Sequence, residues 1–174
     1  MALHTFVAGD VLLAQQLNDS FAAVQLQIAV FNETQAAGTY GGSSTTGSFV
    51  KRTLNTTVKN DITGCSIASS VITLPAGTYY VLARAPINQG GVFQAKLRNT
   101  TDSTDLALSG SGYAPPSTTI NVDSTIQGFF VLAAQKTVEL QQRVGTAVAT
   151  SGYGWAANLG VDEIYSSITI VKVA

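Results

Sequence analysis

The chain has 174 residues, with 9 Lys and Arg against 10 Asp and Glu, a formal net charge of −1 and a single histidine. This near-neutral balance, without a basic stripe in any expected strand or helix, argues against nucleic-acid binding. Charged residues make up only 11% of the chain, and mean hydropathy is positive at +0.25. Such a composition suits an oligomer, in which much of the surface is buried between subunits.

The chain offers little for catalysis. Cys65 is the only cysteine, and the only histidine, His4, lies close to the N-terminus. We therefore expect Cys65 to be a small buried residue on a strand, and no Cys/His or Ser/His/Asp site to form. The N-terminus lacks the pattern of a secretory signal, and no apolar stretch approaches the length of a membrane span. We expect cytoplasmic synthesis, no enzyme activity and no cofactor.

Residues 10–35 have the pattern of one amphipathic helix, with Asp10 as its N-cap. Six apolar residues recur at intervals of 3, 4, 3, 4 and 3, the a/d rhythm of a coiled coil. This heptad seam consists of Ala14, Leu17, Phe21, Val24, Ile28 and Phe31. A lone helix of this length is marginal in water, so the seam predicts a parallel, self-associating bundle. The bulky phenylalanines favour three strands over two; the alternative is a helix lying flat on its own β-domain.

Residues 36–48 (AAGTYGGSSTTGS) have the composition of a flexible Gly/Ser/Thr linker. A helix docked on its own domain rarely needs such a tether, so the linker favours a separate stalk. The expected organisation is therefore an N-terminal anchor segment and heptad helix over 1–35, a linker over 36–48 and a β-domain over 49–174.

From residue 49 onward, strand patterns recur between turn residues. Strands are expected over 66–74, 79–84, 93–98, 118–122, 127–134, 137–144 and 164–173, with turns at 75–77 and 88–91. One face of the strand after the second turn is expected to carry Phe93, Ala95 and Leu97. A shared face is likewise expected for Val138, Leu140, Gln142 and Val144. Many short strands and no second helix predict a mainly β fold, an antiparallel β-sandwich or jelly roll. The loops at 109–117 and 151–160 fit the crossovers of a Greek key.

The opening of the chain resembles a signature of tailed-bacteriophage virion proteins. It runs Thr5-Phe6-Val7-Ala8-Gly9-Asp10-Val11-Leu12 and continues with Ala14, Leu17, Asn18 and Phe21. The phage pattern is TF-x-AG-x-VL followed by A-x-x-LN-x-x-F. This resemblance implies a virion component that is anchored through its N-terminal segment.

The β-domain resembles the jelly roll shared by tumour necrosis factor and complement-type globular heads. The segments that carry this resemblance are 74–80 (LPAGTYY), 128–132 (GFFVL) with 136–141 (KTVELQ), and 164–173 as the closing strand in the middle of a sheet. The resemblance implies a compact homotrimer around an apolar threefold axis. Together with the N-terminal signature it implies a phage head decoration protein or a short fibre. The lack of a collagen stalk and of a secretory signal argues against extracellular signalling.

Two pairs of carboxylates are candidates for acid–base or metal chemistry. Asp102 and Asp105 flank Ser103-Thr104 in an expected loop, and Asp162 adjoins Glu163. Hydrolysis needs two acids on opposing walls of a cleft, so a solvated turn is the simpler interpretation. No metal site is expected, although calcium held by Asp102, Asp105 and a loop carbonyl stays open.

Aromatic residues in two Gly-rich loops are the best candidates for a binding surface: Tyr113 in SGSGYAPP, and Tyr153 and Trp155 in SGYGWAAN. Exposed rings of this kind stack on sugars or contact a protein partner. The alternative is that they cap the core or pack across a trimer interface.

These observations predict two classes of function. The first is a non-enzymatic homotrimeric capsid decoration (cement) protein or short head fibre. It would be made in the host bacterial cytoplasm, lie on the virion surface and bind other virion proteins. The second is a tail fibre or receptor-binding protein that recognises a host surface glycan through Tyr113, Tyr153 and Trp155. Neither class involves nucleic acid or a membrane.

Overall fold

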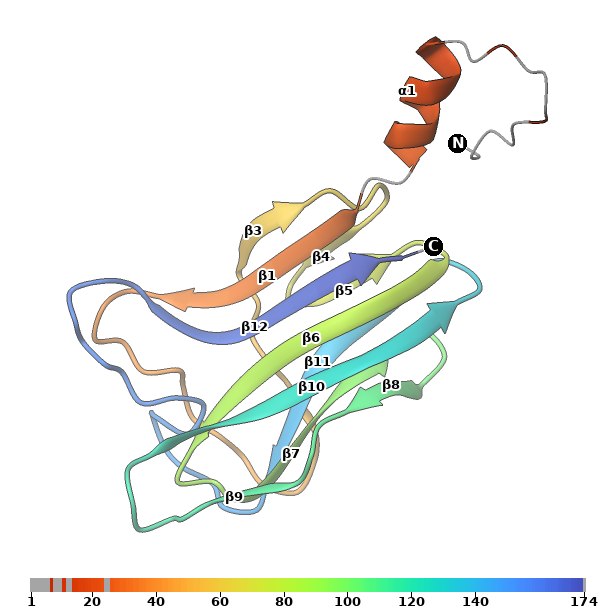
Figure 1. Cartoon of the computed structure of the whole chain (residues 1–174). Coiled ribbons are helices and arrows are strands. Elements are labelled where there is room, and N and C mark those ends of the chain that lie inside the picture. Colours follow the sequence, from red (N-terminus) through yellow and green to blue (C-terminus); the bar gives the residue numbers. More distant parts are fainter. Residues whose placement is uncertain (1–6, 8–10, 12–13, 24–25, 174) are drawn as a thin grey trace.

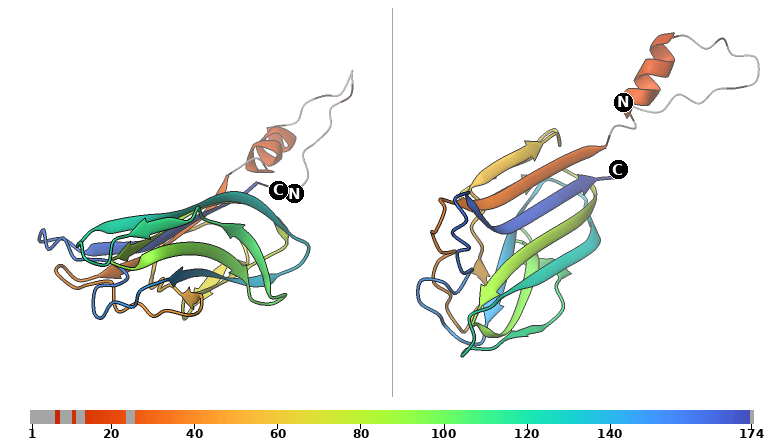
Figure 2. Two further views of the ribbon diagram at one scale, coloured as in Figure 1. Left: turned by 90° about the horizontal axis from the view of Figure 1, so that it is seen from below. Right: turned by 60° about the vertical axis from the view of Figure 1, so that its left-hand side comes forward.

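The computed structural model describes residues 7, 11, 14–23 and 26–173. Two antiparallel sheets are stacked as a sandwich (Figures 1 and 2). The front sheet has the strand order β10-β6-β12-β1-β3. The back sheet has the order β4-β5-β11-β7-β8, with β2 paired to β11 and β9 paired to β7. The mainly β, jelly-roll-like architecture expected from the sequence is therefore confirmed.

The elements have the following bounds. The helix and the front-sheet strands are α1 (Ala14–Ala23), β1 (Gln27–Gln35), β3 (Thr56–Asn60), β6 (Gly77–Asn88), β10 (Asn121–Leu132) and β12 (Glu163–Lys172). The back-sheet strands are β2 (Val50–Lys51), β4 (Ser66–Ala68), β5 (Val71–Leu74), β7 (Gly91–Asn99), β8 (Thr104–Leu108), β9 (Gly112–Ala114) and β11 (Lys136–Val144).

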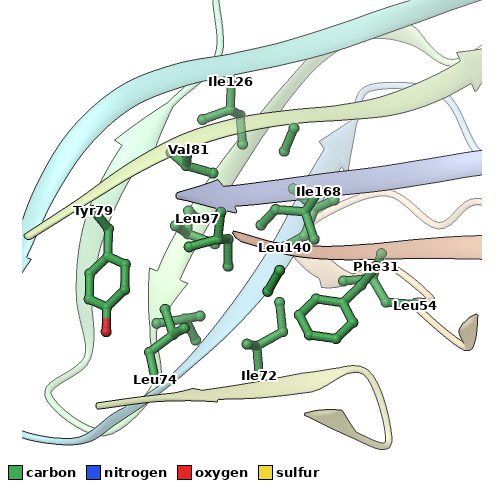
Figure 3. Packing of buried hydrophobic residues seen from close by; sticks show 14 of the residues in the cluster. Phe31, Leu54, Ile72, Leu74, Tyr79, Val81, Leu97, Ile126, Leu140 and Ile168 are labelled. Atoms are coloured by element: carbon green, nitrogen blue, oxygen red, sulfur yellow. The ribbon is translucent and has the colours of Figure 1, made fainter. Parts of the chain in front are cut away.

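The hydrophobic core lies between the two sheets and follows the period-two pattern of the strands. On β7, Phe93, Ala95 and Leu97 are buried, as the sequence predicts. Figure 3 shows Leu97 packed together with side chains from the front sheet, among them Phe31 and Ile168. Burying an aliphatic or aromatic side chain of this size contributes about 1.5–3 kcal/mol, so this layer holds the two sheets together.

The helix expected over 10–35 is wrong in its second half. Helix α1 ends at Ala23, and Gln27–Gln35 forms strand β1 between β12 and β3. In β1, Phe31 is fully buried in the sandwich core, whereas Ile28 lies on the opposite face of the strand. Neither can belong to a helical seam. A short apolar run fits the repeat of a helix as well as that of a strand. Here the segment is stabilised as a strand by hydrogen-bonded pairing with β12 and β3.

The rest of the heptad seam is described only in part. Ala14 and Leu17 lie on α1. Val24 and the predicted N-cap Asp10 lie outside the described residues, and the side chain of Phe21 is also outside the described part.

The expected flexible linker at 36–48 is also wrong. This segment lies along the end of the sandwich, where Ser44 forms a bridge with Val148 and Thr46 forms one with Val144. Its glycines permit close backbone contact: a Cβ on Gly41 would lie 2.5 Å from the carbonyl oxygen of Tyr153. The domain boundary at residue 49 therefore does not hold, since the sandwich already includes β1.

Two strand expectations also differ from the structure. The segment 66–74 is a hairpin, because Ser69 and Ser70 both have positive φ (49° and 62°) and turn the chain back between β4 and β5. The separate strands expected over 118–122 and 127–134 are replaced by one strand, β10, which pairs with β6 along its whole length.

Other expectations are confirmed. The turn at 75–77 falls where β5 ends and β6 begins, and the turn at 88–91 separates β6 from β7. The closing strand β12 lies in the middle of the front sheet, between β6 and β1.

The two ends of the sandwich differ. Helix α1 lies beyond the end at which β1 begins and β12 finishes, whereas the loops after β6, β9, β11 and β1 gather at the opposite end (Figure 1). We call this second group the far-end loops. In the described part of the chain, no helix is long and apolar enough to cross a membrane.

Candidate functional site: an apolar sheet face and the far-end loops

An apolar row crosses the outer face of the front sheet. Directly opposite residues of antiparallel strands point to the same side of a sheet. Phe129 on β10 lies opposite Tyr80 on β6, and their rings are 5.0 Å apart with an interplanar angle of 55°. Tyr80 lies opposite Val171 on β12, which in turn lies opposite Ile28 on β1. The row therefore runs across β10, β6, β12 and β1 without a charged residue.

Neighbouring apolar residues widen this row, with Thr169 as a polar residue between Leu82 and Val30. Phe129 and Val131 are each 69% exposed, and Leu82 is 45% exposed. We call the whole surface the apolar face; it consists of Ile28, Val30, Tyr80, Leu82, Phe129, Val131 and Val171. It occupies the half of the front sheet nearer to α1 (Figure 1). A largely apolar exposed surface of this kind is typical of an interaction site.

The other half of the front sheet is polar. Arg84 pairs with Asp123 at 3.2 Å and also donates to the carbonyl oxygen of Ile164 at 2.8 Å. Thr125 and Ser167 lie beside this pair, on either side of Arg84 in the register. The front sheet thus presents an apolar half and a hydrogen-bonding half to the same side.

Most charged side chains are neutralised by close partners. Seven of the nine lysines and arginines have an acidic partner within 3.8 Å. Asp102 accepts a hydrogen bond from Lys136 at 2.7 Å, which lowers the pKa of this carboxyl. Burial acts to raise the pKa of Asp105, but hydrogen bonds from Arg98 and Lys96 outweigh it and leave this pKa lowered.

This pairing removes the support for a calcium site. Asp102, in the turn after β7, and Asp105, on β8, are both already bound to cationic side chains, which a calcium ion would have to displace. Across the described residues, no group of three His, Cys, Asp or Glu side chains is placed to hold a metal.

The three aromatic residues of the Gly-rich loops do not form one surface. Tyr153 is buried, with the Arg52 guanidinium 4.1 Å from its ring centroid, and burial raises its pKa. Of the two alternatives for Tyr153, an exposed ring and a ring that caps the core, the structure shows the second. Trp155 is 42% exposed and packs against Tyr40, with ring centroids 4.9 Å apart. Tyr113 is 60% exposed on β9, where it lies opposite Val92.

The Trp155 segment is held by backbone contacts. Asn121 accepts a hydrogen bond from the Trp155 N–H at 2.8 Å and donates one to the Trp155 carbonyl oxygen at 3.0 Å. This two-way clamp ties the loop after β11 to the first residue of β10. The exposed part of the Trp155 ring is consequently presented in a defined position.

A buried polar cluster beneath these loops is not predicted by the sequence analysis. Arg52 donates to Glu33 at 3.1 Å, to Gln142 at 2.6 Å and to the carbonyl oxygens of Pro86 and Tyr153 at 2.8 and 3.1 Å. Burial lowers the pKa of Arg52, and the Glu33 carboxylate opposes this shift. One signal was present: Gln142 falls on the buried face of β11, and a polar residue at such a position needs a buried partner.

The remaining carboxylate pair does not act as a catalytic dyad. The Glu163 carboxylate accepts hydrogen bonds from the backbone N–H groups of Asn158, Ala157 and Gly38, at 2.7, 3.2 and 3.2 Å. The hydrogen bond from Asn158, with those from the other two residues, lowers the pKa of Glu163 although burial acts against it. This carboxylate therefore joins two far-end loops and stays ionised.

The single cysteine is equally unsuited to nucleophilic chemistry. Cys65 is half-buried, and burial raises the pKa of its thiol to about 11. At neutral pH almost none of it is present as the reactive thiolate.

No family model matches the chain, and no curated protein sequence matches it. Solved structures do resemble it. Murine APRIL shares 9% identity at a TM-score of 0.54, over 85% of this chain and 99% of that one. The globular domain of zebrafish complement 1qA shares 14% identity at a TM-score of 0.52, over 86% and 97%. The PRD1 vertex protein P5 shares 14% identity at a TM-score of 0.53, over 85% and 97%. At these identities the likeness establishes the fold, a jelly roll of the tumour necrosis factor and complement-head type.

Proposed function

We propose that this protein is a non-enzymatic structural component of a phage virion, a homotrimer that decorates the capsid or forms a short head fibre. The proposal is supported by the likeness to the vertex protein of phage PRD1 and by the N-terminal phage signature at residues 5–21. In this role the protein binds neighbouring shell proteins and stabilises the shell.

The observation that carries the proposal is the apolar face, whose occupants would be two further copies of the same chain. The face spans four strands, has Thr169 between Leu82 and Val30, meets Lys59 of β3 at its edge, and includes the exposed ring of Phe129. Burying each large apolar side chain of the face would contribute about 1.5–3 kcal/mol. Self-association removes this surface from water, as the apolar threefold axis implied by the fold resemblance requires.

The two ends of the sandwich give this trimer a direction. The apolar face and α1 lie at the same end (Figure 1). Assembly around the apolar face would gather the three helices at that end and leave the far-end loops pointing away. An anchor at one end and free loops at the other is the arrangement that a surface-attached virion protein needs.

The assembly is tested by sedimentation velocity on the wild type, Phe129→Asp and a matched control, Leu108→Asp. Leu108 is also an exposed apolar residue, at 56% against 69% for Phe129, but it lies on β8 of the back sheet. We expect wild type and Leu108→Asp to sediment as trimers and Phe129→Asp as a monomer, because three carboxylates would be buried together. A trimer that tolerates the Phe129 change contradicts the proposed interface.

The location is tested by immunogold labelling of intact virions with antibodies against residues 49–174. We expect labels distributed over the head. Labels confined to the tail would rule out capsid decoration and favour the second candidate.

That second candidate is a receptor-binding protein that recognises a host glycan. It is favoured by the exposed rings of Tyr113, on β9, and Trp155, in the loop after β11. In Figure 1, β9 and the loop after β11 lie at the end of the sandwich away from α1. In this case Trp155→Ala should abolish adsorption to host cells without reducing incorporation into virions. Unchanged adsorption would remove Trp155 from the candidate site.

A further inference from the structure

A pocket of about 400 Å³ lies on the outer side of the back sheet, towards the far end. It is formed by the segment before β2, by β7 and β11, and by the residues leading into β9. The side chains that matter for its chemistry are Thr46, Phe49, Val92, Gln94, Ser111 and Arg143. Its volume falls within the range of small-ligand sites.

The strand register separates the pocket into a polar and an apolar part. Arg143 on β11 lies directly opposite Gln94 on β7, so both side chains point to the same side of the sheet. Gln94 donates to the carbonyl oxygen of Ser109 at 3.0 Å, which fixes its amide beside the guanidinium. Val92, two residues earlier on the same side, lies opposite the exposed Tyr113.

The charge in this pocket is uncompensated. Among the described residues, Arg143 is the arginine without an acidic partner, and no carboxylate lines the pocket. The acids of the back sheet are engaged elsewhere: Glu139 pairs with Lys51 at 3.8 Å, and Asp105 pairs with Lys96 and Arg98. An unpaired guanidinium beside amide and hydroxyl groups is a binding group for a carboxylate.

We propose that this pocket binds an acidic sugar, with its carboxylate on Arg143. The planar guanidinium fork matches a carboxylate, and Arg143 is the one cation among the residues that line the pocket. Gln94, Ser111 and Thr46 supply hydrogen-bonding groups for ring hydroxyls. Val92 and the neighbouring Tyr113 supply the apolar surface on which the C–H side of a sugar ring packs, whereas the Phe49 ring is in contact with the Lys96 ammonium at 4.3 Å.

The position of the pocket agrees with an exposed ligand site. It lies on the outer side of the back sheet, whereas the apolar face lies on the outer side of the front sheet. The proposal rests on the receptor-binding function and names its ligand class. It assigns ligand binding to the Arg143 pocket instead of the Trp155 loop. It requires neither the trimer nor a particular place on a virion, because the pocket is contained within one chain.

The test is saturation-transfer difference NMR on the full chain with defined probes. The acidic probes are methyl β-D-glucuronide and N-acetylneuraminic acid, and the neutral probe is methyl β-D-glucoside. We expect a Kd on the order of 1 mM for at least one acidic probe, as is usual for a single sugar unit. The neutral probe should bind at least about tenfold more weakly, because it lacks the charge-assisted hydrogen bonds.

Two variants and a control locate the site. Arg143→Gln removes the cation, and Gln94→Glu places an internal carboxylate directly opposite Arg143, where it competes with the ligand. Each should weaken binding at least about tenfold. Lys172→Gln removes the other lysine or arginine without an acidic partner in the described part, on β12 of the front sheet, and should leave the Kd unchanged. Circular dichroism establishes that each variant is folded.

Three outcomes would overturn the proposal: equal binding of the neutral probe, an unchanged Kd for Arg143→Gln, or stronger competition by phosphate or an acidic peptide than by either acidic sugar. Adsorption to host cells distinguishes failure of the receptor-binding function from failure of the acidic-sugar pocket. Suppose that virions adsorb in a way that depends on Trp155, while the isolated chain binds no acidic sugar. This result would support the receptor-binding function and would reject the Arg143 pocket as its site.

Discussion

Arg52 and Glu33 form an ion pair of 3.1 Å inside the sandwich, with only 1% and 2% of their side chains exposed. Glu33 belongs to β1 of the front sheet, and Arg52 follows β2 of the back sheet. The pair therefore links the two layers, and through the Tyr153 carbonyl oxygen it also holds the loop after β11. Removing either partner leaves an uncompensated charge where water cannot reach it.

Glu33→Gln is expected to lower the free energy of unfolding by about 3–5 kcal/mol, because Arg52 then stays buried without its counter-charge. Urea denaturation at a fixed protein concentration measures the change. The matched control is Asp123→Asn, which breaks the exposed pair with Arg84, at 41% and 40% exposure. The control should cost about 1 kcal/mol or less. Equal losses in both variants would contradict a structural role for the buried pair.

Glu163 is expected to make stability depend on pH in the acidic range. Its hydrogen bonds from Asn158, Ala157 and Gly38 lower the folded-state pKa below the ordinary value of 4.5. The stabilisation is therefore complete above that value and is lost as pH falls through it towards the lower folded-state pKa. Thermal melts of wild type and Glu163→Gln from about pH 6 to about pH 3 measure this. The Tm of the variant should fall less steeply with pH, and parallel curves would disprove the assignment.

Cys65 is expected to react slowly with thiol reagents in the folded protein. Its pKa is raised from 9.0 to about 11, so the thiolate fraction at neutral pH falls by about 100-fold. Stopped-flow reaction with dithionitrobenzoate, in buffer and in denaturant, compares the native and unfolded rates. A native rate close to the unfolded rate would show that the thiol is not shielded.

Deleting residues 1–23 is expected to leave the sandwich folded and the proposed trimer intact. Helix α1 contributes no strand to either sheet, and the apolar face lies on β10, β6, β12 and β1. Circular dichroism melts and sedimentation velocity measure the two properties, and incorporation into virions should be lost. A deletion variant that is folded but monomeric would show that assembly depends on the N-terminal helix and its heptad seam, and not on the apolar face.

The β-strands could be predicted from the sequence where one face is buried. In β7 and β11 the alternation of apolar and polar residues shows which side chains face the core and which face solvent. A shift by one residue would turn the apolar side chains towards solvent. The same reasoning failed for 27–35, where Ile28 and Phe31 fit a heptad as well as a strand. Only the ladders to β12 and β3, which join residues far apart in sequence, decide between the two periods.

The candidate sites were harder to predict because they depend on register between distant strands. Tyr153 and Trp155 are two residues apart, yet one is buried under Arg52 and the other is partly exposed. The Arg143 pocket joins β7, β11 and the segment before β2, which no local pattern connects. The apolar face was likewise hidden, since Phe129, Tyr80 and Val171 become neighbours only through pairing.

The close pairing of cations and acids on this surface has a consequence for encounter rates. Opposite charges separated by less than 4 Å cancel one another well within a Debye length, so little field extends into the solvent. Partners are therefore not steered from a distance, and the rate at which they meet the protein should change little with ionic strength. Short-range contacts, rather than long-range attraction, are then expected to decide which partners stay bound.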